Sequence, residues 1–136
     1  MIILGIDPGE KNIGVAISDP SATISRPLTI IPHLSRQIDA ARIVEIAVNH
    51  NVGKIIVGYS QTTEGVPSHQ GRKSIRLGEA VRDKASIPVV FFEENDSTKR
   101  AQEIRREMGV KKKKRSGHLD DFAASIILQE YLDRLK

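Results

Sequence analysis

The chain has 136 residues, 39% of them apolar, with 21 Lys plus Arg against 17 Asp plus Glu and no cysteine. This length is typical of one domain with its own core, so we expect residues 1–136 to form a single domain. The absence of cysteine excludes thiol catalysis, cysteine-bound metals and redox switching. No apolar run approaches the roughly 18 residues of a membrane span, and no signal peptide precedes Asp7, so we expect a cytoplasmic protein.

The basic residues are concentrated in one segment. Residues 99–115 contain nine Lys or Arg against two Glu, so the rest of the chain carries a net negative charge. The centre of this segment is the run Lys111, Lys112, Lys113, Lys114 and Arg115. Such a local excess is typical of proteins that bind DNA or RNA, although a plain solvated loop has the same composition. With two Tyr and three Phe in the whole chain, we expect recognition of nucleic-acid shape and phosphate rather than base stacking.

Apolar periodicity predicts the secondary structure in chain order. Alternating or continuous β-branched residues predict strands over 2–6, 13–17, 27–31, 54–59 and 88–92. Apolar residues at helical spacing predict helices over 36–50, 68–85, 98–108 and 119–135. The first two strands are joined by the tight turn after Asp7, which makes them a hairpin. Three meandering strands followed by alternating helices and strands predict an α/β fold with a mixed sheet.

Three acidic residues lie where elements end or begin. Asp7 follows the first apolar strand, Glu94 follows the strand that ends at Phe92, and Asp120 begins the last helix. Sites in α/β sheets form beside the carboxyl ends of strands, so these carboxylates are the strongest candidates for catalysis. Close carboxylates repel each other unless a cation compensates them. Mg²⁺ or Mn²⁺ prefers such oxygen ligands, and a pair of these ions supports phosphodiester hydrolysis.

No other catalytic motif is present. The four histidines have no zinc-binding spacing, and the segment from Asp7 to Gly14 fits neither a phosphate-binding loop nor the dinucleotide fingerprint. His118 alone is kept as an accessory candidate, because it lies two residues before Asp120. Asp121 is about 100° around the helix from Asp120, and we expect it to be an accessory or surface acid.

Taken together, these residues resemble the YqgF (RuvX) family, which is similar to the RuvC-type Holliday junction resolvases of the RNase H-like superfamily. The matching segments follow one another over nearly the whole chain: Gly5-Ile6-Asp7-Pro8-Gly9, Ile13-Gly14-Val15-Ala16, Arg26-Pro27-Leu28, Ile55-Ile56-Val57-Gly58, Glu64-Gly65, Glu93-Glu94, Ser97-Thr98, Gly117-His118-Leu119-Asp120, Ala123-Ala124 and Ile126-Ile127-Leu128. The motif Asp-x-Gly after a strand also occurs near the start of actin-like ATPases. The resemblance to the YqgF (RuvX) family is therefore specific because all these segments occur in the same order, and not because of any one of them.

The resemblance implies an RNase H-like fold, with a mixed five-stranded sheet flanked by helices. It also implies a divalent metal site and cleavage of structured nucleic acid, since family members are described as junction resolvases and as nucleases that mature the 16S ribosomal RNA precursor. If the family's roles hold at the matching positions, the resemblance implies that Asp7, Glu94 and Asp120 are the catalytic, metal-binding carboxylates. The chain departs from the family at Asn95, where an Arg is usual, and at Tyr59-Ser60-Gln61-Thr62, where a Leu-Pro pair is common.

Several basic residues are expected to contact substrate phosphates. Lys11, with Asn12, lies on the turn after Asp7, and the run 111–115 lies shortly before Asp120. Weaker candidates with the same charge are Arg26, Arg72, Lys73 and Arg76. The expected partners are precursor ribosomal RNA or branched DNA and precursor ribosomal particles, with the chain acting as a monomer or a homodimer.

Two alternatives remain open from the sequence. The first is a non-catalytic module that binds nucleic acid or ribosomes with the same fold. The second is an actin-like nucleotide-binding protein, which would need two such domains around its nucleotide, so the length disfavours it unless the chain dimerises. Cleavage that depends on a divalent ion favours the nuclease, and binding without cleavage favours the module.

Overall fold

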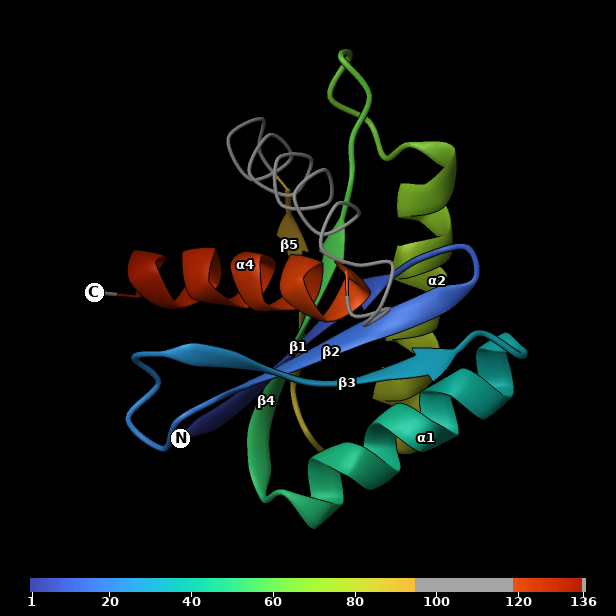
Figure 1. The fold of residues 1–136 in the computed structure, drawn as a ribbon. Helices are drawn as coiled ribbons and strands as arrows, with labels where there is room; N and C mark the ends of the chain where they lie inside the picture. Colours follow the sequence, from blue (N-terminus) through green and yellow to red (C-terminus); the bar gives the residue numbers. More distant parts are fainter. Residues whose placement is uncertain (95–118, 136) are drawn as a thin grey trace.

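A computed structural model describes residues 1–94 and 119–135, and of residues 119–121 it describes the backbone alone (Figure 1). The described strands are β1 (Ile2–Pro8), β2 (Asn12–Ser18), β3 (Ser25–Pro32), β4 (Val52–Tyr59) and β5 (Val89–Glu93). The described helices are α1 (Arg36–Asn49), α2 (His69–Lys84) and α4 (Leu119–Arg134). These bounds confirm the predicted elements to within two residues at each end, and β3 and β4 each begin two residues earlier than expected. The predicted helix over 98–108 lies outside the described residues.

The sheet is mixed, with the strand order β3-β2-β1-β4-β5. β1 pairs antiparallel with β2, and β2 pairs antiparallel with β3. On the other side β1 pairs parallel with β4, and β4 pairs parallel with β5. β1 is therefore the central strand, and the carboxyl ends of β1, β4 and β5 lie at one edge of the sheet. The expected mixed five-stranded sheet is confirmed.

Local sequence explains where the turns and helices begin. Gly9 occupies the β1–β2 turn, where its N–H donates to the carbonyl of Asn12 at 2.9 Å and a Cβ would lie 2.6 Å from that oxygen. Only glycine permits this close approach. Ser35 caps α1 by accepting from the N–H of Ile38, and Ser68 caps α2 by accepting from the N–H of Gly71. These caps satisfy N–H groups that a helix leaves unpaired.

Helices cover both faces of the sheet (Figure 1). On one face, side chains of β1, β2 and β4 such as Ile6, Val15 and Val57 pack with α1 and α2. On the other face, Ile3 and Ile56 pack against Leu128 and its neighbours in α4. Because successive strand residues point to opposite faces, the continuous apolar runs of β1 and β4 supply both cores.

α4 approaches the sheet closely because the strands beneath it carry small residues. A Cβ on Gly5 would lie 2.8 Å from the Cβ of Leu128, and a Cβ on Gly58 would lie 3.2 Å from methyl groups of Ile127. Ala16 of β2 is fully buried in the same core. Any larger side chain at Gly5 would push α4 away from the sheet. Within the described part of the chain, none of the helices is both long and apolar enough to cross a membrane.

Candidate functional site

Asp7 lies near the carboxyl end of the central strand. Ile3 and Gly5 of β1 face α4, whereas Leu4 and Ile6 face the α1–α2 side. Alternation along the strand therefore places Asp7 on the face that α4 covers. Its side chain is partly buried and its strand partner in β2 is Gly14. The carboxylate that the sequence favoured is thus at the edge of the sheet, beside residues too small to cover it.

Glu94 lies at the same edge. Its N–H donates to the carbonyl of Tyr59 at 2.9 Å, which extends the pairing of β5 with β4 by one residue. Phe92 belongs to the core beneath α4, so alternation places Glu94 on the α4 face and Glu93 on the opposite face. Glu94 is partly buried and Glu93 is exposed. The two neighbouring glutamates are therefore not equivalent, and Glu94 shares its face with Asp7.

The residue of the intervening strand β4 at the level of Asp7 is Gly58, which has no side chain. Ile6 pairs with Val57, and Gly58 pairs with Phe92, so Asp7 and Gly58 lie at one level of the sheet. Neighbouring strands lie about 4.8 Å apart, so the backbones of β1 and β5 are about 10 Å apart. Glu94 lies two residues beyond that level, or about 7 Å farther along the sheet. Because position 58 is glycine, Ile127 of α4 packs directly against β4 at this level, with two methyl groups 3.2 Å from where a Cβ would lie.

The third acid of the predicted set, Asp120, is the second residue of α4. α4 crosses β1, β2 and β3 on the face that carries Asp7 and Glu94. The side chains of Asp120 and Asp121 lie outside the described residues. Within residues 1–94 and 122–135, no three acidic or histidine side chains are grouped closely enough to hold a metal ion.

The predicted basic contacts are only partly placed. Lys11 is exposed on the β1–β2 turn, next to the strand end that carries Asp7, and its carbonyl accepts from the N–H of His33 at 2.8 Å. Arg26 and Arg72 are also exposed, on β3 and α2. The side chains expected at Lys111 to Arg115 and at His118 lie outside the described residues, and so does Asn95.

The segment after Tyr59, where the sequence departs from the family, forms a narrow hairpin-like loop. Gln61 makes an isolated bridge with Pro67, and the N–H of Thr62 donates to the carbonyl of Val66 at 2.8 Å. The base of the loop is tied to the start of α2, because the N–H of Ser68 donates to the carbonyl of Ser60 at 3.0 Å. The exposed tip therefore projects beyond the carboxyl edge of the sheet (Figure 1).

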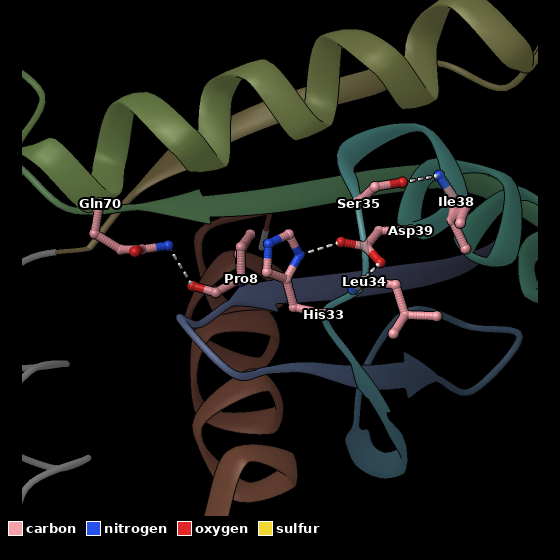
Figure 2. Close-up of polar contacts among 7 residues, drawn as sticks. All are labelled: Pro8, His33, Leu34, Ser35, Ile38, Asp39 and Gln70. Atoms are coloured by element: carbon pink, nitrogen blue, oxygen red, sulfur yellow. Dashed lines mark hydrogen bonds and ion pairs between the residues drawn. The ribbon is translucent and has the colours of Figure 1, made fainter.

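A cavity of about 280 Å³ lies near the same edge, on the α1–α2 side of the sheet. In its wall, His33 contacts the buried carboxylate of Asp39 through Nδ1 at 2.5 Å, and Asp39 also accepts from the N–H of Leu34 at 3.0 Å (Figure 2). His33 is one of the four histidines without zinc-binding spacing, and no sequence motif indicates Asp39. Lys73 and Arg76, which were weak phosphate candidates, also line this cavity. Their spacing of three residues indicates that they share one face of α2, but it does not indicate the cavity.

Comparison with known proteins decides the family. The model of a family described as RuvX, Holliday junction resolvase, matches residues 1–134. The chain belongs to the RuvX family. This confirms the expected family and places the chain in a class of enzymes that hydrolyse phosphodiester bonds.

Curated relatives match this RuvX member over its whole length. A protein of Caldanaerobacter subterraneus subsp. tengcongensis is 42% identical over 137 residues, covering 100% of this chain and 99% of the relative. A protein of Syntrophus aciditrophicus is 38% identical, covering 99% of this chain and 90% of the relative. Both carry the name "Putative pre-16S rRNA nuclease".

Solved structures with the same fold are RuvC-type resolvases. Thermus thermophilus RuvC in complex with Holliday junction substrate superposes with a TM-score of 0.59 at 18% identity, covering 99% of this chain and 96% of that one. The fowlpox virus resolvase in complex with substrate Holliday junction DNA gives a TM-score of 0.58 at 17% identity, covering 99% of both chains. These likenesses confirm the expected RNase H-like fold.

Proposed function

We propose that this RuvX member is a divalent-metal-dependent endonuclease of structured nucleic acid, with residues 1–136 acting as one nuclease domain. Its first candidate substrate is the 16S ribosomal RNA precursor, after the names of the curated relatives. Its second is a four-way DNA junction, after the family description and the resolvase complexes. The observation that carries the proposal is the arrangement of Asp7 and Glu94 at one edge and on one face of the sheet, beneath the helix that begins at Leu119 and Asp120.

The donor set fits a divalent cation. Carboxylate oxygens are the ligands that Mg²⁺ and Mn²⁺ prefer. A pair of such ions is one arrangement that supports phosphodiester hydrolysis. We propose that Asp7, Glu94 and Asp120 hold these ions. When bound, the ions would activate water and stabilise the leaving oxygen.

The remaining proposed roles concern substrate binding. Lys11 lies beside the strand end that carries Asp7, where it can contact a phosphate next to the cleaved bond. Lys111, Lys112, Lys113, Lys114 and Arg115 supply charge that holds the backbone without reading sequence. His118 and Asp121 are accessory candidates near Asp120.

If the run 111–114 holds phosphates, replacing its four lysines by alanine lowers the slope of log affinity against log salt by about three to four. An unchanged slope refutes this role.

The test of the proposal is cleavage of labelled 16S precursor RNA and of four-way DNA junctions in Mg²⁺, Mn²⁺ or EDTA. We expect Asp7→Asn and Glu94→Gln to lower the cleavage rate by about 100-fold or more, the scale seen when one preorganised stabilising group is removed. The matched control is Glu93→Gln, because this adjacent glutamate is exposed on the opposite face of β5. It should leave the rate within about twofold.

The same experiment separates the alternatives. Metal-dependent cleavage that is lost in Asp7→Asn but kept in Glu93→Gln supports the nuclease and identifies its substrate. Binding of either nucleic acid without cleavage, under every ion, supports a non-catalytic binding module instead. Equal losses in all three variants would point to a general charge effect and would contradict the assigned carboxylates.

A further inference from the structure

The cavity on the α1–α2 side has no role in the proposed chemistry. It is formed where the β1–β2 turn, the segment after β3 and the first half of α2 meet. Pro8 lies in the wall of the cavity and directly follows Asp7 in the sequence. The cavity is therefore next to the proposed metal site. The side chains of Pro8 and Asp7 point to opposite faces of the sheet. The cavity is therefore adjacent to the carboxylate site and distinct from it.

Cationic side chains predominate in the wall. Arg36 comes from the first turn of α1, while Lys73 and Arg76 come from α2, where their spacing of three residues places them on one face. The acidic lining residues are Glu10 and Asp39. Asp39 is already engaged by hydrogen bonds from residues 33 and 34. The three cations are exposed residues that line one cavity, and together they favour an anionic group such as a phosphate.

Gln70 supplies an unused acceptor in the same wall (Figure 2). Its Nε2 donates to the carbonyl of Pro8 at 3.2 Å. A carbonyl only accepts hydrogen bonds, so this contact fixes which end of the amide faces Pro8. The other end, Oε1, is buried and has no hydrogen-bond partner among the described residues. Buried acceptors are normally paired, and this one has less than 1 Å² of accessible surface, so an N–H or O–H donor of a ligand reaches it once the Gln70 side chain shifts toward the cavity.

The apolar part of the lining comes from Pro8, Ile13 and Leu77, and the polar residues His33 and Ser35 complete the wall with Gly9. We propose that the cavity binds one nucleotide, with its phosphate at Arg36, Lys73 and Arg76, a donor of its base or ribose at Gln70 Oε1, and its ring against the apolar wall. The volume of about 280 Å³ is close to the lower end of ordinary ligand pockets. The nucleotide is either a unit of the substrate strand beside the cleaved bond or a free mononucleotide. The first source rests on the proposed nuclease function.

The test uses NMR titration of the ¹⁵N-labelled full chain in EDTA, so that no cleavage occurs. The probes are the four nucleoside monophosphates, a non-cleaved tetranucleotide, inorganic phosphate and the nucleosides. We expect a nucleotide probe to shift the amide signals of Gly9, Ser35 and Gln70, which line the cavity. Lys73→Ala and Arg76→Ala should each weaken binding about tenfold, as expected for loss of one charge-assisted contact. The matched control is Lys84→Ala, which removes the same charge from α2 about 16 Å from Lys73.

Each outcome bears on the proposal. If a monophosphate shifts the cavity signals, a free nucleotide is sufficient for binding. If only the tetranucleotide shifts them, the bound nucleotide is a unit of the strand. Either result supports the proposal when Lys73→Ala and Arg76→Ala weaken binding and Lys84→Ala does not. The proposal is overturned if no nucleotide shifts the cavity signals, if inorganic phosphate binds as tightly as every nucleotide, or if Lys84→Ala weakens binding equally. If the wild type cleaves nucleic acid but no nucleotide binds in the cavity, the cavity proposal is wrong and the proposed nuclease function stands. If a nucleotide binds in the cavity but no substrate is cleaved, the nuclease function is contradicted and the cavity proposal stands.

Discussion

The close contact between Gly5 and α4 makes a specific prediction about stability and activity. In Gly5→Ala the new methyl carbon would lie 2.8 Å from the Cβ of Leu128 and 3.4 Å from its Cγ. Carbon atoms in contact are normally about 3.5–4.0 Å apart, so helix and strand must separate by roughly 0.7 Å or more. Leu128 cannot avoid the contact by rotating, because its Cβ is fixed to the helix backbone.

The expected cost follows from this displacement. One extra methyl group forced into a packed core costs about 1–3 kcal/mol, so we expect the free energy of unfolding to fall by about 2 kcal/mol. For a chain of this size the melting temperature should fall by on the order of 6 °C. If Asp120 acts from the first turn of the same helix, cleavage should fall by on the order of tenfold or more, since sites tolerate only about 0.5 Å of misplacement.

The assay is urea unfolding followed by circular dichroism, with metal-dependent cleavage measured where both proteins are fully folded. Gly58→Ala is the matched control, because its methyl carbon would lie 3.2 Å from the Cδ1 and Cγ2 methyl groups of Ile127, a smaller overlap than the 2.8 Å at Gly5. We expect it to lose less than half as much stability. If Gly5→Ala unfolds within about 0.5 kcal/mol of wild type, or if Gly58→Ala loses as much, the packing argument is wrong.

Two further predictions concern the buried carboxylate of Asp39 and the carboxylate of Asp19 in the loop between β2 and β3. Asp39→Ala removes the buried acceptor for His33 and Leu34 and should lower the free energy of unfolding by about 3 kcal/mol. Asp39→Asn keeps one acceptor oxygen and should lose less stability. Equal losses for the two variants in urea unfolding would contradict this. Hydrogen bonds, above all from the Ile24 N–H, hold the pKa of Asp19 well below its usual range. Its stabilising contribution is therefore present above the unfolded-state pKa of about 4 and is lost as the pH falls below it. Asp19→Asn should then lower the melting temperature at pH 7 more than at pH 2, and a pH-independent difference would refute this.

Much of the fold could be predicted from local patterns. The apolar run Ile55-Ile56-Val57 predicted a strand buried on both faces, and the structure places Ile56 beneath α4 and the other two on the α1–α2 side. Ser35 predicted the start of α1, and it caps that helix. These predictions succeed because strand alternation and helix capping depend on residues a few positions apart.

The candidate site was only partly predictable. Strand ends indicated Asp7 and Glu94, and the family resemblance indicated the same residues, but neither could show that Glu94 shares a face with Asp7 while Glu93 does not. That distinction depends on which strand residues pack beneath α4, a contact between segments more than 30 residues apart. The assigned roles of these carboxylates stay predictions until the cleavage experiment is done.

The cavity was not predictable at all. Its wall combines Pro8, Arg36 and Gln70 from three separate segments, and no spacing in the sequence connects them. The sequence by itself determined the order and type of the elements, the family and the acids at the strand ends, because short-range periodicity and ordered motifs record these. Only the tertiary structure decided which face each acid occupies and which distant side chains meet, because these follow from how the helices pack across the sheet.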